Sequence, residues 1–153
     1  MDQPIAPRLE RPLLVGALVL SGVAPILPLT AAALMRNDIR DLAAHALVAY
    51  AAVLVGFLGG LRWGAELRRS PAAPTPARLA AAASATVIGW AALLSPTRVA
   101  LLLLLGTAAV QLAWDLVAAR SGHLPAWMGP LRMAVAAVAA LCLGAVAAAL
   151  TDA

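Results

Sequence analysis

The chain contains no lysine and little charge of either sign. Charged residues make up 12% of the 153 residues and aromatic residues only 4%, whereas about a quarter of a soluble globular protein is charged. Hydrophobic residues account for 63% of the chain, and the mean hydropathy is +0.93. A soluble domain of this length cannot bury so much apolar surface, but a lipid bilayer solvates it. The composition therefore predicts an integral membrane protein.

The scarcity of cysteine and the distribution of basic residues exclude further classes of protein. Cys142 is the only cysteine, so neither an intramolecular disulfide nor a cysteine-based zinc site can form. The net charge of +4 comes from arginine alone. These arginines stand singly or in pairs between apolar runs, which favours a role at a membrane surface and excludes nucleic acid as a partner.

Five apolar runs each approach the roughly 20 residues that a helix needs to cross a bilayer. Short segments rich in proline, glycine or charge separate them. We expect an all-α membrane protein, a bundle of five transmembrane helices over residues 13–35, 42–67, 78–94, 98–119 and 130–150. Residues 1–12 are expected to form a polar cytoplasmic segment, 13–150 one transmembrane domain, and 151–153 a short tail.

Two of these runs leave alternatives open. The first run is longer than the apolar region of a signal peptide, about 7–15 residues, so we expect it to remain as a spanning helix. Pro25 and Pro28 would kink or loosen it, which membrane helices tolerate where neighbours satisfy the freed carbonyl groups. The third run is alanine-rich and ends at Ser95 and Pro96. If it is only partly inserted, the bundle has four spans.

The arginines of the short loops predict the orientation, because cytoplasmic loops carry an excess of basic residues. The side that holds the N-terminus carries Arg8, Arg11, Arg68, Arg69, Arg78 and Arg120, and the other side carries Arg36, Arg40 and Arg98. We therefore expect the N-terminus inside, in a multi-pass protein of the cell inner membrane.

Four ionisable residues interrupt the apolar runs at one depth. Arg62 and Glu66 fall near the end of the second run, Asp115 near the end of the fourth, and Arg132 near the start of the fifth. Carboxylates near a helix C-terminus and a cation near an N-terminus oppose the helix dipole, so neutralisation across helices is favoured. Asp115 with Arg62 or Arg132 is the preferred pair, because a guanidinium holds a carboxylate through two hydrogen bonds.

Other interpretations of these four charges remain open. Arg62 and Glu66 are four residues apart and could pair along one helix. Charges near a membrane end also extend to the headgroups, which applies most to Glu66 and Arg132. A structural cluster is favoured over catalysis or proton transfer, and we assign no catalytic residue.

Small and aromatic residues complete the pattern. Glycines of the second run indicate a close helix–helix contact, within the bundle or between copies; they are Gly56, Gly59, Gly60 and Gly64. The four tryptophans suit aromatic belts at the membrane interfaces; Trp63, Trp114 and Trp127 are expected at the inner interface and Trp90 at the outer one.

Metal and cofactor sites are not expected. His45 and His123 are the only histidines, and the predicted topology places them on opposite sides of the membrane. The chain has no phosphate-binding glycine loop, nucleophile elbow or zinc-ligand spacing. The lipid bilayer is therefore the one partner that the sequence requires, and a membrane-protein partner or a second copy remains open.

Several motifs resemble those of a known family. They are Leu58-Gly59-Gly60-Leu61-Arg62-Trp63-Gly64, then Gln111-Leu112-Ala113-Trp114-Asp115, and Pro125-Ala126-Trp127 with Leu131-Arg132. Together they resemble the domain of unknown function 3429 family, small multispanning proteins of proteobacteria that are similar to transmembrane protein 69 of animal mitochondria. The resemblance implies an integral inner-membrane protein and carries no established activity.

Three functions are compatible with these observations. The favoured one is an interaction or assembly protein, such as an accessory subunit of a membrane complex, because the chain is small and has a glycine packing face. The second is a small transporter or a lipid- or quinone-binding protein, which requires a cavity that reaches Arg62 and Asp115. The third is a membrane enzyme acting on a lipid, which requires a carboxylate with an accessible oxygen.

Overall fold

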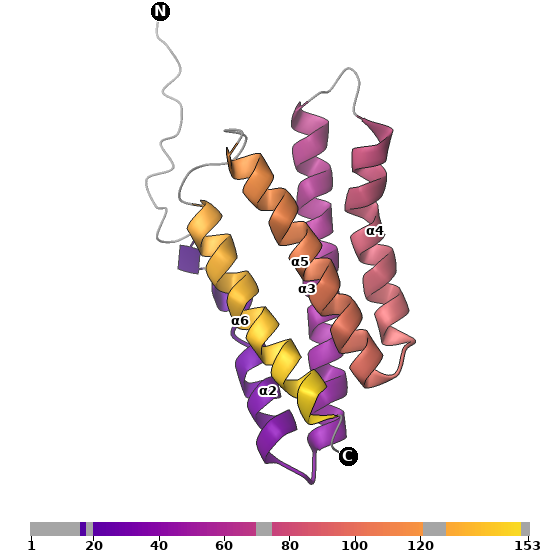
Figure 1. Ribbon diagram of the computed structural model, residues 1–153, viewed down its shortest axis with the longest axis vertical. Coiled ribbons are helices and arrows are strands. Elements are labelled where there is room, and N and C mark those ends of the chain that lie inside the picture. Colours follow the sequence, from indigo (N-terminus) through magenta and orange to yellow (C-terminus); the bar gives the residue numbers. More distant parts are fainter. Residues whose placement is uncertain (1–15, 18–19, 70–74, 121–127, 151–153) are drawn as a thin grey trace, which may run out of the picture.

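The computed structural model describes residues 16–17, 20–69, 75–120 and 128–150. Within these residues there is no β-strand, and consecutive helices run in opposite directions (Figure 1). The five helices are α2 (Ile26–Met35), α3 (Arg40–Arg69), α4 (Pro76–Leu93), α5 (Thr97–Arg120) and α6 (Met128–Ala149). The predicted all-α class is confirmed.

Helices α3 to α6 are long and apolar enough to cross a membrane. The apolar stretches are Arg40–Arg68, Pro76–Leu93, Thr97–Val117 and Pro130–Ala149. Their lengths of 18 to 29 residues suit a hydrocarbon layer of about 30 Å, given a rise of about 1.5 Å per residue. These helices agree in length and composition with the last four predicted spans, and full insertion of the alanine-rich third run stays a prediction.

The first apolar run is not one continuous helix. Turn residues 22–25 separate the helical residues 20–21 from α2, which has only 10 residues. At about 15 Å, α2 alone covers half of the hydrocarbon layer. Pro25 is its N-cap, and Pro28 falls in its first turn, where a missing N–H is tolerated. The prolines therefore mark an interruption and the start of a new helix, and a span over 13–35 stays a prediction.

A neighbouring helix satisfies a carbonyl group at this interruption. The Tyr50 hydroxyl of α3 donates a hydrogen bond to the Gly22 carbonyl oxygen at 2.6 Å. An unpaired carbonyl is costly in hydrocarbon, where water cannot replace the lost partner. The bond between Tyr50 and Gly22 therefore explains how the chain tolerates a turn within this apolar run.

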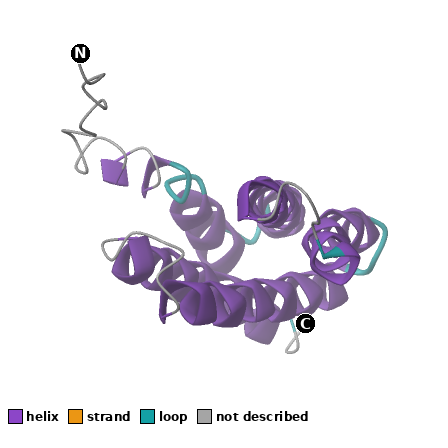
Figure 2. Ribbon diagram, turned by 90° about the horizontal axis from the view of Figure 1, so that it is seen from above, coloured by secondary structure: helices purple, strands orange, loops and turns teal. Residues whose placement is uncertain are grey.

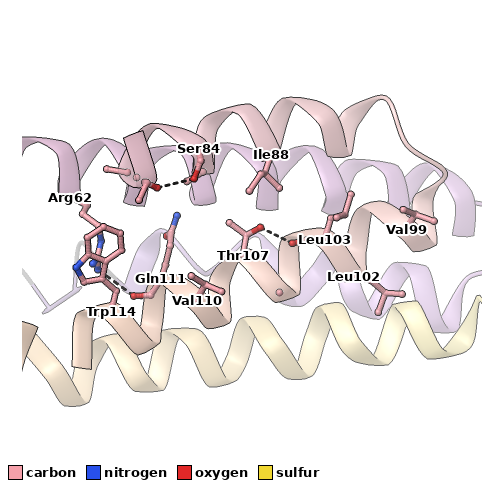
Figure 3. Close-up of a pocket in the computed structure, with 15 residues that line it drawn as sticks. Arg62, Ser84, Ile88, Val99, Leu102, Leu103, Thr107, Val110, Gln111 and Trp114 are labelled. Carbon is pink, nitrogen blue, oxygen red and sulfur yellow. Dashed lines mark hydrogen bonds between the residues drawn. The ribbon is translucent and has the colours of Figure 1, made fainter. Parts of the chain in front are cut away.

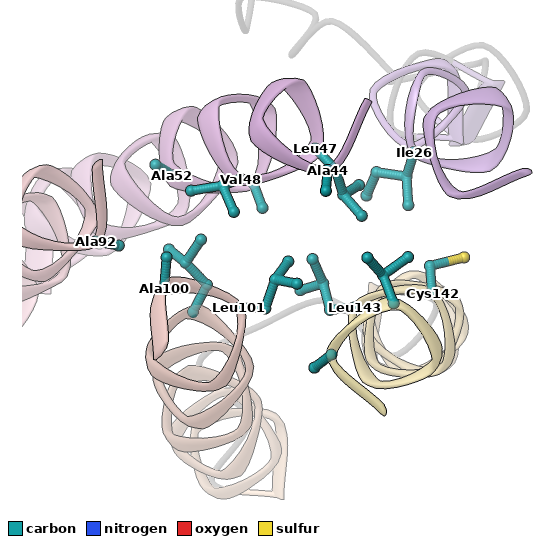
Figure 4. Close-up of a cluster of buried hydrophobic side chains, with 14 of the residues drawn as sticks. Ile26, Ala44, Leu47, Val48, Ala52, Ala92, Ala100, Leu101, Cys142 and Leu143 are labelled. Carbon is teal, nitrogen blue, oxygen red and sulfur yellow. The ribbon is translucent and has the colours of Figure 1, made fainter. Parts of the chain in front are cut away.

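The helices form two layers with the hydrophobic core between them. Helices α2, α3 and α4 lie side by side in one layer, and α5 and α6 cover them in the other (Figure 2). Side chains from both layers meet in Figure 4. The completely buried ones are small or aliphatic and include Ala44, Leu47, Ala92, Ala100, Leu101 and Leu104. Most of this core lies where α3 and α5 begin and α4 and α6 end.

Glycines allow α3 and α4 to approach closely. A Cβ atom on Gly59 would lie 2.7 Å from the Ala82 carbonyl oxygen, and one on Gly89 would lie 3.0 Å from the Ala52 carbonyl oxygen. Both distances are shorter than an ordinary van der Waals contact, and the contacted oxygens belong to the backbone, so they cannot rotate away. A side chain at either position would therefore push α3 and α4 apart.

The other glycines of α3 are less constrained. A Cβ atom on Gly56 would make an ordinary contact, 3.7 Å from Thr86 Oγ1. Within the described part of the chain, no atom would lie within 4 Å of a Cβ on Gly60 or Gly64. The close contact therefore depends on Gly59, and the four-residue spacing of Gly56, Gly60 and Gly64 does not define it. A role for Gly60 and Gly64 between copies stays a prediction.

Polar side chains stabilise the turns at the end of the bundle where α3 and α5 begin. Arg36 binds the exposed Asp38 carboxylate through Nε and Nη2, at 3.0 and 2.8 Å, and thereby holds the pKa of Asp38 below its usual range. His45 Nδ1 donates to the Asp41 carbonyl oxygen at 2.8 Å, so Nε2 accepts a hydrogen bond from the Thr97 hydroxyl at 3.2 Å. His45 thus links α3 to the start of α5.

Candidate functional site

An ion cluster joins three helices at the end of the bundle where α3 and α5 end and α6 begins. Asp115 of α5 uses both carboxylate oxygens: Oδ1 pairs with Arg62 Nη2 of α3, and Oδ2 pairs with Arg132 Nη1 of α6. The Arg62, Asp115 and Arg132 side chains are 9%, 13% and 20% exposed. We call these three residues the ion cluster; Asp115 thus contacts both of the arginines that the sequence offered as its alternative partners.

Further contacts hold the Arg62 guanidinium against α5. Its Nη2 atom also donates a hydrogen bond to the Gln111 carbonyl oxygen at 3.2 Å. Its Cζ atom lies 4.4 Å from the centroid of the Trp114 ring, within the range of a cation–π interaction. Figure 3 shows Trp114 and Gln111 beside Arg62. Arg62 therefore links α3 to α5 at this end.

Glu66 makes its ion pair with a residue that the sequence analysis did not select. Glu66 Oε1 lies 3.5 Å from Arg78 Nη1 in the first turns of α4. Arg78 is 42% exposed and Glu66 13%, so this pair is the more solvated one. Arg78 was placed among the orientation-determining arginines, and only the pairing of α3 with α4 reveals it as a partner of Glu66.

The ion cluster is incompletely neutralised. Two arginines share one aspartate, which leaves a formal charge of +1 on three mostly buried side chains. Burying charge away from water is unfavourable unless it is paired and hydrogen-bonded. Hydrogen bonding to Gln111 and stacking on Trp114 compensate part of this burial, and an anion beside Arg62 would compensate more.

A cavity of about 570 Å³ lies between α3, α4 and α5 and extends to the ion cluster. Along α5 it runs from Val99 to Trp114, about 22 Å of helix at 1.5 Å per residue. The described lining residues are Gly59, Arg62, Ala81, Ala82, Ser84, Ala85, Ile88, Val99, Leu102, Leu103, Gly106, Thr107, Val110, Gln111 and Trp114. Arg62 is the one charged residue among them, and it lies at one end (Figure 3).

The polar groups of this cavity differ in how they are satisfied. Within the described residues, Ser84 and Thr107 donate to carbonyl oxygens of their own helices, at 2.9 and 2.7 Å. Gln111 is only 8% exposed, and its Nε2 donates to the Val55 carbonyl oxygen at 3.2 Å. Gln111 Oε1 is buried and has no hydrogen-bond partner in the described part of the chain. The unsatisfied acceptor therefore lies at the same end as Arg62.

The tryptophans occupy different environments. Trp63 and Trp90 are 40% and 63% exposed, and their positions at the membrane interfaces stay predictions. Trp114 is half-buried against Arg62 and lines the cavity. Trp127 lies outside the described residues. The sequence analysis placed Trp114 in an aromatic belt and did not anticipate its contact with Arg62.

One further residue of the site, Gln111, was not selected from sequence. Gln111 was quoted only as part of a motif, and its only signal was an amide within an otherwise apolar helix. The described residues contain no group of three or more histidine, cysteine, aspartate or glutamate side chains that could hold a metal ion.

Comparison with known proteins agrees with the motif resemblance. A family model described as "Protein of unknown function (DUF3429)" matches residues 12–148. The chain belongs to this family. It is also similar to "Transmembrane protein 69" of Xenopus tropicalis, with 33% identity over 129 residues, which is 80% of this chain and 50% of the relative. The chain thus spans about half the length of that relative. No solved structure matches.

Membership of the DUF3429 family supports a multi-pass membrane protein and leaves the activity open. The match covers α2 to α6, with the ion cluster and the cavity between α3, α4 and α5. The family description names no reaction, ligand or partner. The function must therefore be argued from the chemistry of this site.

Proposed function

We propose that this protein binds an amphiphilic membrane lipid in the cavity between α3, α4 and α5. The observation that carries this proposal is the cavity itself, about 570 Å³, apolar for most of its length and polar at the end near Arg62. Small-molecule sites are typically apolar clefts of about 300–1,000 Å³ with a few convergent polar groups. A lipid tail fits the apolar part, and its polar head fits the end with Arg62, Gln111 and Trp114.

The distribution of polar groups favours binding over transport. A transporter must offer partners to a polar head along the whole path, since an unsatisfied polar group is costly in hydrocarbon. The middle of the cavity contains Ser84 and Thr107, whose hydroxyl donors are already used within their own helices. A head bound at Arg62 would lose its partners on moving toward Val99, so the cavity is suited to retention.

The engagement of Asp115 disfavours an enzyme that uses it as an acid or base. Each of its carboxylate oxygens pairs with an arginine, and a general base must instead have an oxygen within reach of the substrate proton. The accessory-subunit hypothesis has no specific contact in its favour and stays a prediction. It would be tested by looking for a co-purifying protein in mild detergent.

Location and orientation belong to the same proposal. The end of the bundle with Arg62 also carries Arg68, Arg78 and Arg132, whereas the other end carries Arg36, Arg40 and Arg98. Basic residues accumulate on the cytoplasmic side of inner-membrane proteins. We therefore place the ion cluster in the cytoplasmic leaflet, with the N-terminus inside and the first run as a fifth span.

A matched pair of glycine substitutions tests lipid binding. Gly106 lines the cavity, and Gly144 of α6 is not among the described lining residues. No atom lies within 4 Å of a Cβ at either position, so both accept a side chain without a backbone clash. Gly106→Phe should fill the cavity and abolish the lipid that the wild type retains in mild detergent, measured by native mass spectrometry.

A substitution at Gly144 of α6 provides the control for this experiment. Gly144→Phe should retain lipid as the wild type does, because Gly144 is on α6 and is not among the described residues that line the cavity. Both variants should remain folded, which the reactivity of the buried Cys142 thiol reports. A folded Gly106→Phe protein that retains as much lipid as the wild type would exclude this cavity as the binding site.

A further inference from the structure

The polar end of the cavity has unused hydrogen-bond donors. The contacts of Arg62 with Asp115 and with the Gln111 carbonyl both use Nη2. A guanidinium has five N–H donors, of which Nη2 supplies two. Neither of these two contacts uses Nε or Nη1 of Arg62. Arginine binds phosphate and carboxylate oxygens through such paired donors, so this edge suits an anionic group.

The net positive charge of the ion cluster also favours an anionic ligand. Arg62, Arg132 and Asp115 together carry a formal charge of +1, and no described lining residue of the cavity is acidic. Glu66 pairs with Arg78 and also attracts Arg62, and the five side chains taken together, three arginines and two carboxylates, still carry a formal charge of +1. A single negative charge beside Arg62 would complete the neutralisation of this mostly buried group, whereas a zwitterionic head would introduce a second cation.

The side-chain amide oxygen of Gln111 lacks a hydrogen-bond donor, which is a second requirement on the ligand. Its Nε2 must face the Val55 carbonyl oxygen, because a carbonyl only accepts, and this contact fixes which amide atom is Oε1. Oε1 is then buried without a partner in the part of the chain that the structure describes. Buried polar atoms are nearly always hydrogen-bonded. Neighbouring atoms cover Oε1 in this structure, so a head hydroxyl would satisfy this oxygen once the Gln111 side chain shifts toward the cavity.

We infer that the lipid bound in this cavity is an anionic glycerophospholipid with a hydroxylated head. Its phosphate accepts hydrogen bonds from Arg62, a head hydroxyl donates to Gln111 Oε1, and an acyl chain lies along the apolar wall toward Val99. This inference rests on the proposed function and adds the chemistry of the head. Because Trp114 is in contact with Arg62, its fluorescence can report the arrival of the lipid.

The experiment compares three lipids on one protein. Trp63, Trp90 and Trp127 are replaced by phenylalanine, which leaves Trp114 as the single tryptophan, and the protein is placed in phosphatidylcholine nanodiscs. A brominated acyl chain, which quenches tryptophan fluorescence on contact, is then introduced on phosphatidylglycerol, phosphatidylmethanol or phosphatidylcholine. The first is anionic with hydroxyls, the second anionic without a hydroxyl donor, and the third zwitterionic.

Quenching should be strongest for phosphatidylglycerol, weaker for phosphatidylmethanol and weakest for phosphatidylcholine. The apparent affinities of the first and the last should differ on the order of tenfold or more, because phosphatidylcholine lacks the hydroxyl donor and brings a cation next to the positively charged ion cluster. In Gln111→Met, which removes the acceptor, phosphatidylglycerol and phosphatidylmethanol should become equivalent. The reactivity of Cys142 again reports whether each variant is folded.

The outcomes separate this inference from the proposed function. Equal quenching by all three lipids that Gly106→Phe abolishes would overturn the selection of the head and leave lipid binding intact. Equal quenching by the two anionic lipids in the wild type would overturn the role assigned to Gln111. Quenching that Gly106→Phe does not change for any lipid would overturn both proposals.

Discussion

Replacing Asp115 by asparagine tests whether the ion cluster holds the bundle together. The substitution preserves the shape of the side chain and removes the single negative charge that Arg62 and Arg132 share. Two cations then face each other across α3 and α6 with no carboxylate between them. An amide can still accept one hydrogen bond, but it cannot neutralise either arginine.

The expected effect is large because the group is mostly buried. The Asp115 side chain is 13% exposed, between partners at 9% and 20%. Removing one member of a buried ion pair typically costs about 3–5 kcal/mol, since the remaining charge stays desolvated. For a chain of this length, that corresponds to a decrease of the melting temperature on the order of 10 °C.

The chain provides both the probe and the control. Cys142 is the only cysteine and is buried in α6, so a thiol-reactive fluorescent dye follows unfolding in detergent without an introduced label. Asp38→Asn is the matched control. Its carboxylate also binds an arginine, but both side chains are 60% exposed, and exposed ion pairs contribute little to stability. Asp38→Asn should melt close to the wild type.

The refuting result follows directly from this comparison. If Asp115→Asn melts within the same small range as Asp38→Asn, then the ion cluster does not stabilise the fold. A second variant tests the electrostatic cause. Adding Arg132→Gln to Asp115→Asn restores the formal charge of +1, so it should recover part of the lost melting temperature. No recovery would mean that hydrogen-bond geometry, and not charge, explains the loss.

Two further predictions concern the helix contacts. Gly59→Ala should lower the melting temperature, because its Cβ would lie 2.7 Å from the Ala82 carbonyl oxygen and overpacking of this kind costs about 1–3 kcal/mol. Gly60→Ala should leave the melting temperature unchanged, since no atom of the described residues lies within 4 Å of its Cβ. Equal effects of the two variants would contradict the assigned contact between α3 and α4. Tyr50→Phe should cost about 0.6–1.7 kcal/mol, the range for hydrogen bonds between membrane helices, because the Gly22 carbonyl loses its donor; an unchanged melting temperature would show that the turn does not need it.

Much of the fold and part of the site could be predicted from sequence because they depend on quantities that sequence records directly. The length of an apolar run and its flanking breakers determine a membrane helix, so α3 to α6 agree with the predicted spans. Depth and helix direction placed Arg62, Asp115 and Arg132 near the same end of the bundle and gave Arg62 or Arg132 as the partner of Asp115. That Asp115 contacts both arginines depends on the packing of α3, α5 and α6.

The remaining features depend on which helix faces which, and sequence periodicity does not record it. Gly59 was grouped with three other glycines, although only the rotation of α3 relative to α4 makes it critical. Gly89 was not selected, since its partner is a backbone atom of Ala52. The interruption before α2 was anticipated only as a kink. A donor from Tyr50, 28 residues away, makes a complete turn tolerable.

Glycines contribute to both the closely packed and the open parts of the bundle. Gly59 and Gly89 hold α4 against α3, and Arg62 holds α5 against α3 at the end with the ion cluster. Between these contacts, Gly106 of α5 presents no side chain to the cavity. Larger residues there would pack α5 against α4 and gain dispersion energy. A bound anionic lipid would fill this space and bring a negative charge next to the ion cluster, in which two arginines share one carboxylate.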